Sequence, residues 1–129
     1  MRLVPLVVAT VVALAACGDE PTRVERAVDV LEDDDRFTTG ERAGEAMADV
    51  GALLQEEGTE CRSADPEAPR CDALLSASAA AQVTAARILG CTAPGRFEAR
   101  TALADHLRAV DDDPRTAGPP PAPPDCGAP

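Results

Sequence analysis

Apolar side chains recur at helical spacing along the first half of the chain. Apolar residues three and four positions apart over 24–31 predict a first helix, which ends in the acidic run 33–35. Thr38 and Glu41 have the spacing of a capping box, so a second helix is expected to open there and to end before Gly58. The buried face of this second helix is expected to consist of Ala43, Met47, Val50 and Leu54.

The same periodicity continues in the second half. A third helix is predicted over 72–89, with Gly90 as its C-terminal cap; alanines cover nearly every side, so we expect it to be the central helix. A fourth is predicted from about Pro94 to Val110, and residues 115–129 are expected to be extended because they are rich in proline and glycine. The buried residues of the fourth helix are expected to be Phe97, Leu103, Ala104 and Leu107. The predicted fold class is therefore all-α, a small bundle of about four helices with an extended Pro-rich C-terminal tail.

The N-terminal segment has the pattern of a secretory signal. Arg2 is followed by an apolar stretch over 3–16 that ends in small residues. This stretch is shorter than the roughly 20 apolar residues of a membrane-spanning helix, and acidic residues follow it directly. Leu14-Ala15-Ala16-Cys17 resembles the lipobox of bacterial lipoprotein precursors. The resemblance covers residues 1–17 only, and the alternatives are an ordinary signal cleavage nearby or a buried helix that happens to contain a cysteine.

The resemblance implies how the chain is processed and where it is held. Residues 1–16 would be removed, and Cys17 would be lipidated by diacylglycerol and become the new N-terminus. Two acyl chains attach a protein stably to a lipid bilayer, so the expected location is the extracytoplasmic face of the cell membrane. Residues 17–22 would then be a short tether, 23–113 the helical domain and 114–129 the Pro-rich tail.

Composition adds two constraints to this picture. Residues 17–129 contain no lysine and 11 arginines against 23 acidic residues, so charge does not favour nucleic acid as a partner. Only 17 of these 113 residues are Leu, Ile, Val or Phe, which is a thin core for a helical domain. Covalent cross-links are therefore expected to compensate.

Four cysteines remain once Cys17 is set aside, an even number that indicates two disulfides in an exported chain. Cys71 and Cys91 would lie at opposite ends of the third helix, about 30 Å apart, too far for a bond. An antiparallel hairpin brings Cys61 to Cys71, which leaves Cys91 to pair with Cys126 if the tail doubles back along the fourth helix. A zinc site is the alternative interpretation of these four cysteines. For the tail, the alternatives are a proline-rich ligand for a partner domain or a flexible spacer.

The chain contains few of the residues on which catalytic sites usually depend. His106 is the only histidine, predicted to be half-exposed, and without lysine the usual nucleophile–base pairs are missing. We predict no catalytic residue, no metal site and no cofactor. The acidic runs 33–35 and 111–113 are expected to be solvated helix ends, although a shared cation site would become more credible if the fold brought them together.

These observations favour a membrane-anchored, non-catalytic lipoprotein that acts as a protein-interaction or structural module of the cell envelope. The alternative is a lipoprotein that binds a small ligand or a divalent cation. An enzyme that depends on His106 ranks third.

Overall fold

The computed structural model describes residues 20–126, and this part of the chain is all-α. Its elements are α2 (Arg23–Glu32), the 3₁₀ turn η1 (Asp34–Phe37), α3 (Gly40–Ala64), α4 (Pro69–Arg87), the 3₁₀ turn η2 (Ile88–Gly90) and α5 (Ala93–Asp112). The predicted signal peptide and Cys17 lie outside the described residues.

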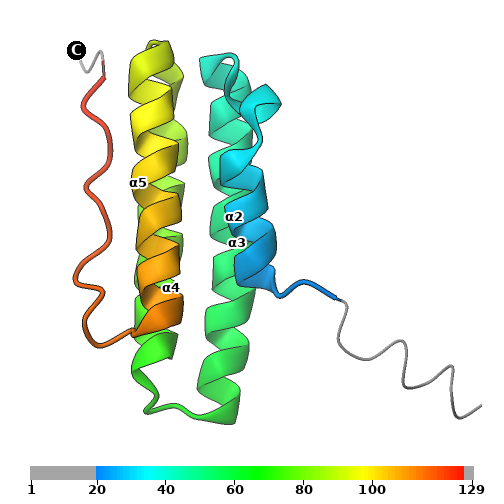
Figure 1. The fold of residues 1–129 in the computed structure, drawn as a ribbon, viewed down its shortest axis with the longest axis vertical. Helices are drawn as coiled ribbons and strands as arrows, with labels where there is room; N and C mark the ends of the chain where they lie inside the picture. Colours follow the sequence, from blue (N-terminus) through cyan, green and yellow to red (C-terminus); the bar gives the residue numbers. More distant parts are fainter. Residues whose placement is uncertain (1–19, 127–129) are drawn as a thin grey trace, which may run out of the picture.

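The helices alternate in direction along the long axis of the molecule (Figure 1). Each packs on two neighbours, α2 on α3 and α5, and α4 on α3 and α5, so the four helices form a ring. The expectation that the third helix is central is therefore wrong: α4 is one of four helices around a shared core, and its most extensive contact is with α3. The core residues come from all four α-helices and from both 3₁₀ turns, and alanines make up a large part of them.

The start of α3 differs from the prediction by one residue. Thr39 is the N-cap, and its side chain accepts a hydrogen bond from the backbone N–H of Arg42 at 3.1 Å. The Thr38 hydroxyl instead donates to the carbonyl of Asp35 at 3.3 Å, within the 3₁₀ turn that connects α2 to α3. Two adjacent threonines offer the same capping chemistry, and the unpredicted turn decides between them.

Gly58 does not end the second predicted helix, because α3 continues to Ala64. It is buried in the middle of the helix, where a Cβ atom would lie 2.6 Å from Cγ of Leu75 on α4. Gly51, two turns earlier, is also buried, and its carbonyl accepts a hydrogen bond from the Ser78 hydroxyl at 2.7 Å. Glycine at these positions therefore allows close approach of α3 and α4 and is not a stop signal.

The end of the third predicted helix also differs. The α-helical part ends at Arg87 and tightens into η2, and Gly90 is not a left-handed cap, since Gly118 is the one described residue with a positive φ. The stretch Pro69–Gly90 is long and apolar enough to cross a membrane, the only such helix among the residues described. It packs against α3 and α5 as a bundle helix.

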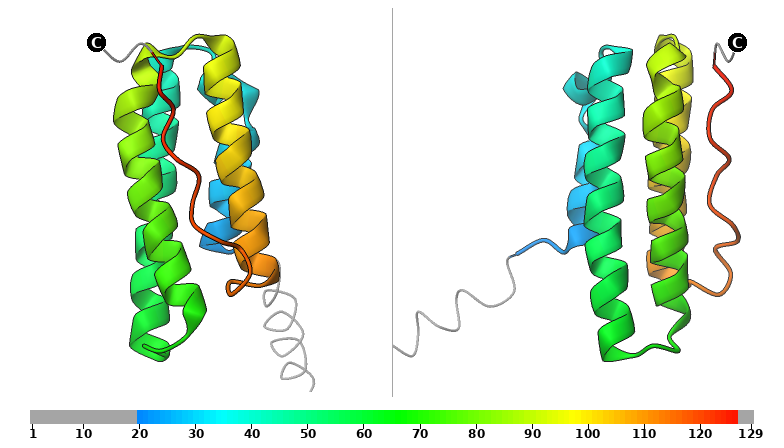
Figure 2. Two further views of the ribbon diagram at one scale, coloured as in Figure 1. Left: turned by 90° about the vertical axis from the view of Figure 1, so that its left-hand side faces the viewer. Right: turned by 180° about the vertical axis from the view of Figure 1, so that it is seen from behind.

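Both predicted disulfides are present. Cys61–Cys71 closes the loop between α3 and α4 with a Cα–Cα distance of 5.3 Å. Cys91–Cys126 ties the tail to the start of α5 with a Cα–Cα distance of 4.7 Å. The described part of the tail has no regular secondary structure and runs back along α4 and α5 (Figure 2), as the pairing required.

Candidate functional site

The most unusual side-chain arrangement lies where α5 meets the end of α2 and η1. The Arg100 guanidinium donates to the carbonyl of Leu31 at 3.0 Å and pairs with the carboxylate of Asp34. It also stacks with Phe37 and Phe97, at 5.2 and 4.8 Å from the ring centroids. These two phenylalanines are the only aromatic residues in the chain, so its entire aromatic content surrounds one arginine.

Arg100 is 8% exposed, and its Nε is buried without a hydrogen-bond acceptor among the described residues. Phe97 is 59% exposed, which contradicts the prediction that it is buried. The reason is geometric: three residues further along α5, Arg100 takes the inward position, and the Phe97 ring covers the guanidinium from outside. A buried arginine needs hydrogen-bonding carbonyls, and the end of α2 supplies one.

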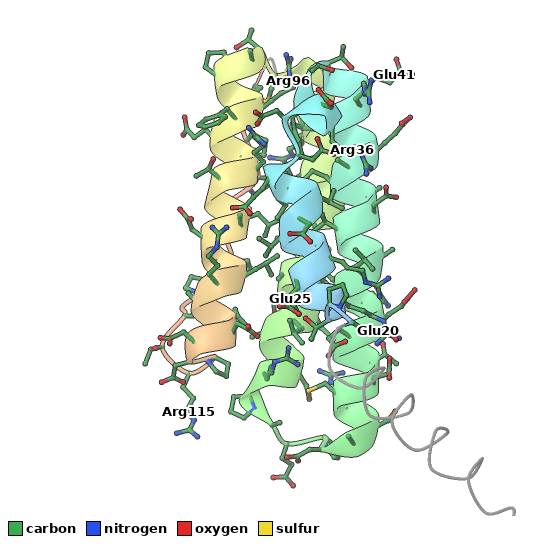
Figure 3. All side chains as sticks on the ribbon, turned by 45° about the vertical axis from the view of Figure 1, so that its right-hand side comes forward. Glu20, Glu25, Arg36, Glu41, Arg96 and Arg115 are labelled. Carbon is green, nitrogen blue, oxygen red and sulfur yellow. A yellow bond between two sulfur atoms is a disulfide. The ribbon has the colours of Figure 1, made fainter. Side chains whose placement is uncertain are left out.

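Arg96, one turn before Arg100, joins the same region. Its guanidinium donates to the carbonyls of Phe37 at 2.9 Å, Thr38 at 3.1 Å and Cys91 at 2.8 Å. In the part of the chain that the structure describes, no carboxylate forms an ion pair with Arg96. Carbonyls are neutral, so the positive charge of Arg96 is not compensated by them. Figure 3 shows Arg96 at the opposite end of α5 from Arg115.

A hollow of about 570 Å³ opens between η1 and the first turns of α5. Its lining is mixed, with apolar and cationic side chains next to one carboxylate: Asp34, Phe37, Thr38, Ala93, Pro94, Arg96, Phe97 and Arg100. A second hollow of about 240 Å³ lies on the other side of Phe97 and Arg100. The larger one has the size of a small-molecule pocket. We call it the Phe97 pocket.

The wall of the Phe97 pocket includes the N-terminus of α5. Thr92 is the N-cap, but its side chain makes no capping hydrogen bond, and the first turn has no acidic residue. The other three α-helices each have an acidic residue in the first turn. The positive end of this helix dipole is therefore not neutralised within the first turn.

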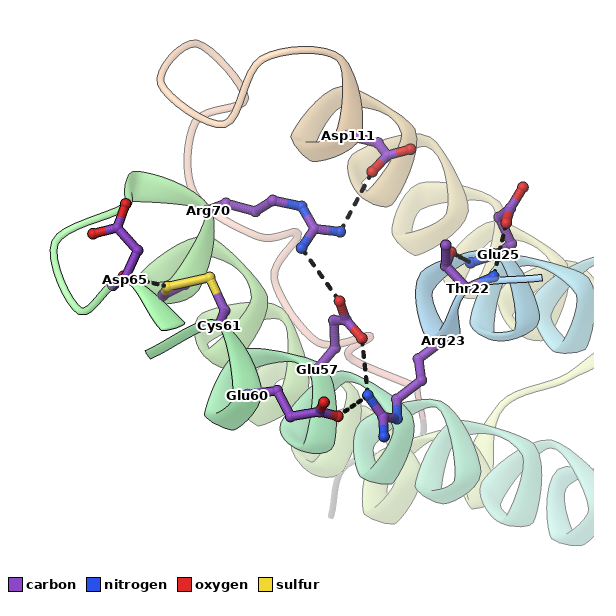
Figure 4. A network of polar contacts seen from close by, with 10 residues as sticks. Thr22, Arg23, Glu25, Glu57, Glu60, Cys61, Asp65, Arg70 and Asp111 are labelled. Atoms are coloured by element: carbon purple, nitrogen blue, oxygen red, sulfur yellow. Dashed lines mark hydrogen bonds and ion pairs between the residues drawn. A yellow bond between two sulfur atoms is a disulfide. The ribbon is translucent and has the colours of Figure 1, made fainter. Parts of the chain in front are cut away.

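The opposite end of the bundle has a network of ion pairs that links all four α-helices (Figure 4). Arg23 of α2 pairs with Glu57 of α3 at 3.2 Å, and with Glu56 and Glu60, and its pKa is raised, chiefly by the hydrogen bond to Glu57. Arg70 of α4 bridges Glu57 at 3.4 Å and Asp111 of α5 at 3.6 Å. The charges compensate one another and lie beside the Cys61–Cys71 disulfide, which is a structural arrangement.

His106 is 8% exposed, so the prediction that it is half-exposed is wrong. Desolvation lowers its pKa below the ordinary value of 6.5. It lies on α5 three turns after Gly95, where an added Cβ atom would lie 2.9 Å from Sγ of Cys126, so the two residues share one side of the helix. None of the described residues hydrogen-bonds to its ring.

The two acidic runs do not meet. Residues 33–35 lie at the junction of α2 and η1, whereas 111–113 lie at the far end of α5, near the Cys61–Cys71 loop (Figures 1 and 4). Within residues 20–126 no group of three or more His, Cys, Asp or Glu side chains could hold a metal ion. A cation site shared by the two runs is thus not formed.

The sequence offered few signals for the Phe97 pocket. The two aromatic residues were visible, but nothing in the sequence distinguished arginines 96 and 100, on the fourth helix, from the other arginines. One available signal was that the first turn of that helix lacks the acidic residue found in the others. No known protein family, curated protein or solved structure matches the chain, and the function is therefore argued from its own residues and geometry.

Proposed function

We propose that this protein is a lipid-anchored extracytoplasmic lipoprotein, whose disulfide-linked helical bundle acts as a non-catalytic binding module of the cell envelope. The observation that carries the proposal is the combination of the lipobox at Cys17 with four further cysteines that form two disulfides. Disulfides form and persist in oxidising compartments outside the cytoplasm, where a lipoprotein would be exported.

The short tether gives the bundle an orientation at the membrane. Five residues lead from Cys17 to the capping Thr22, so the lipid anchor would hold the start of α2 within about 17 Å of the bilayer. The compensated ion-pair network around Arg23 belongs to this end of the molecule. The Phe97 pocket lies beyond the other end of α2, about 15 Å further along the axis. It would face away from the membrane, toward whatever the module binds.

The side chains around His106 support binding over catalysis. A catalytic histidine needs access to substrate and an orienting hydrogen-bond partner. His106 is almost fully buried and lies on a different face of α5 from Arg100. The Phe97 pocket is lined by two arginines, one aspartate and mainly apolar side chains, a set that can bind and position a ligand.

Membrane fractionation tests the anchor. We expect the wild-type protein to be in the membrane fraction and to need detergent for release. Cys17→Ala removes the acceptor thiol, and the variant should remain unprocessed or appear in the soluble extracytoplasmic fraction. The double variant Cys61→Ser, Cys71→Ser is the matched control, because it removes two thiols and one disulfide but keeps Cys17.

The control variant should fractionate like the wild type. The proposal is wrong if Cys17→Ala loses residues 1–16 and is still membrane-bound to the same extent as the wild type, or if the wild-type protein is released by salt alone. Salt releases proteins that are bound to the membrane by charge, whereas it does not release proteins that are anchored by lipid chains.

A specific observation also favours the small-ligand alternative: the mixed apolar and cationic lining of the Phe97 pocket. This alternative concerns only the ligand of the helical domain, and the proposed lipid anchor at Cys17 is the same in both cases.

A further inference from the structure

We infer that the Phe97 pocket is a binding site for small organic acids, in which a carboxylate is attached to an apolar, preferably aromatic, body. The inference names the ligand class of the small-ligand alternative, and it does not depend on lipidation of Cys17.

The charge of the Phe97 pocket favours an anionic ligand. The chain as a whole has a net charge of −11, yet two arginines and one aspartate line this pocket. Asp34 already pairs with Arg100, so the charge left over is that of Arg96. The three carbonyls bound to Arg96 use only part of its N–H donors, which leaves donors free for an acceptor in the pocket. A carboxylate fits these donors and this charge.

The N-terminus of α5 also favours an anion in this pocket. The first turn of α5 forms one wall through Ala93 and Pro94, and it has neither a capping side chain nor an acidic residue. A carboxylate beside Arg96 would thus also meet the positive end of the helix dipole. The helix end alone would be weak evidence, but it lies beside Arg96, whose guanidinium lines the same pocket and bonds only neutral carbonyls among the described residues.

The exposed apolar surface at the rim of the pocket favours a ligand with an apolar body. Phe97 leaves more than half of its surface exposed at the rim, and Phe37, Ala93 and Pro94 extend the apolar wall. A ring stacked on Phe97 would remove this surface from water. The walls are held in place before binding, because Arg96 and Arg100 bond α5 to the carbonyls of α2 and η1. Preorganised walls reduce the entropy lost on binding.

The test is a titration of the purified full-length protein with phenylacetate, followed by the backbone amide signals of Ala93, Gly95 and Arg96. Acetate and 2-phenylethanol are the matched probes, since one has the charge without the ring and the other the ring without the charge. We expect saturable shifts with phenylacetate and at least about tenfold weaker binding of either partial probe.

Two variants locate the site. Phe97→Ala removes the exposed ring and should weaken phenylacetate binding about tenfold, whereas Leu89→Ala, at a residue of equal exposure outside the pocket lining, should leave it unchanged. Ala93→Glu places a carboxylate at the first position of α5, where it favours the helix, and should abolish binding without unfolding the protein.

The inference is overturned if phenylacetate causes no shifts in the first turn of α5 up to about 20 mM. It is equally overturned if 2-phenylethanol binds as tightly as phenylacetate, because binding would then be apolar adsorption only. The same holds if acetate binds as tightly as phenylacetate, because the site would then hold an adventitious ion only. Unchanged binding by Phe97→Ala or Ala93→Glu would place the site elsewhere. Failure here leaves the fractionation result intact, and failure of the anchor leaves the titration intact.

Discussion

At the scale of single residues, one buried arginine joins three segments of the chain. Arg100 bonds the carbonyl at the end of α2, pairs with the carboxylate that opens η1, and stacks with both phenylalanines. Its planar guanidinium can make these contacts together, whereas an ammonium group cannot reproduce them. The ion pair with Asp34 is exposed on the acid's side and contributes little by itself, so the carbonyl and ring contacts are the important ones.

Arg100→Lys should therefore lower the free energy of unfolding by about 2 kcal/mol although the charge is kept. Arg87→Lys is the control, because Arg87 is exposed in the last turn of α4, and it should change the unfolding free energy by less than about 0.5 kcal/mol. Urea unfolding of both variants measures the difference. Equal stability of the two variants would mean that Arg100 acts only as a surface charge.

His106 makes a second residue-scale prediction, on pH. Burial holds its pKa below 6.5, so above that pH both folded and unfolded states have a neutral ring. As the pH falls below 6.5 the unfolded state takes up the proton first, and the wild type loses stability relative to His106→Gln. Unfolding free energies of the two proteins across this range give the difference, in which the carboxylates cancel. A difference that stays constant with pH would contradict the burial of His106.

At the scale of elements, the packing of α3 against α4 and η2 depends on small residues. Gly40, at the start of α3, lies so close to the carbonyl oxygen of Leu89 that a Cβ atom would overlap it. At Gly58 the obstacle is Cγ and one terminal methyl group of the Leu75 side chain, which a change of side-chain rotamer can move. A backbone atom cannot move aside in the same way, so the two glycines differ in what they tolerate.

Gly40→Ala should lower the free energy of unfolding by about 2 kcal/mol. Gly58→Ala should cost clearly less, because Leu75 can shift and alanine gains about 1 kcal/mol of helix propensity over glycine. Thermal unfolding of the two variants provides the ranking. If Gly58→Ala is the more destabilising change, the α3–α4 contact at Leu75 is more rigid than this account holds.

Much of the element level could be predicted from the sequence. The four helices follow from apolar periodicity, and the disulfide pairing follows from the length of a single helix between Cys71 and Cys91. Gly58 was misread because a glycine inside a helix and one that ends it look alike until the neighbouring helix is known. The exposure of Phe97 and the burial of His106 were mispredicted because both depend on what packs beside α5 in the folded chain.

At the scale of the whole molecule, the two ends of the bundle have different chemistry. One end has mutually paired charges around Arg23 and Arg70, next to the Cys61–Cys71 loop. The other has an uncompensated arginine, exposed aromatic surface and the second disulfide, which fastens the tail across α4 and α5. A lipid anchor at Cys17 would place the first end at the membrane and leave the second free to bind.

The intact mass of the protein extracted from membranes, measured with and without reductant, tests this account most directly. We predict a chain that begins at Cys17, has the added mass of a diacylglyceryl group, and gains the mass of four hydrogen atoms when its two disulfides are reduced. A chain cleaved at another position without acyl groups would contradict the lipid anchor. A smaller gain on reduction would contradict the disulfides that hold the bundle and its tail together.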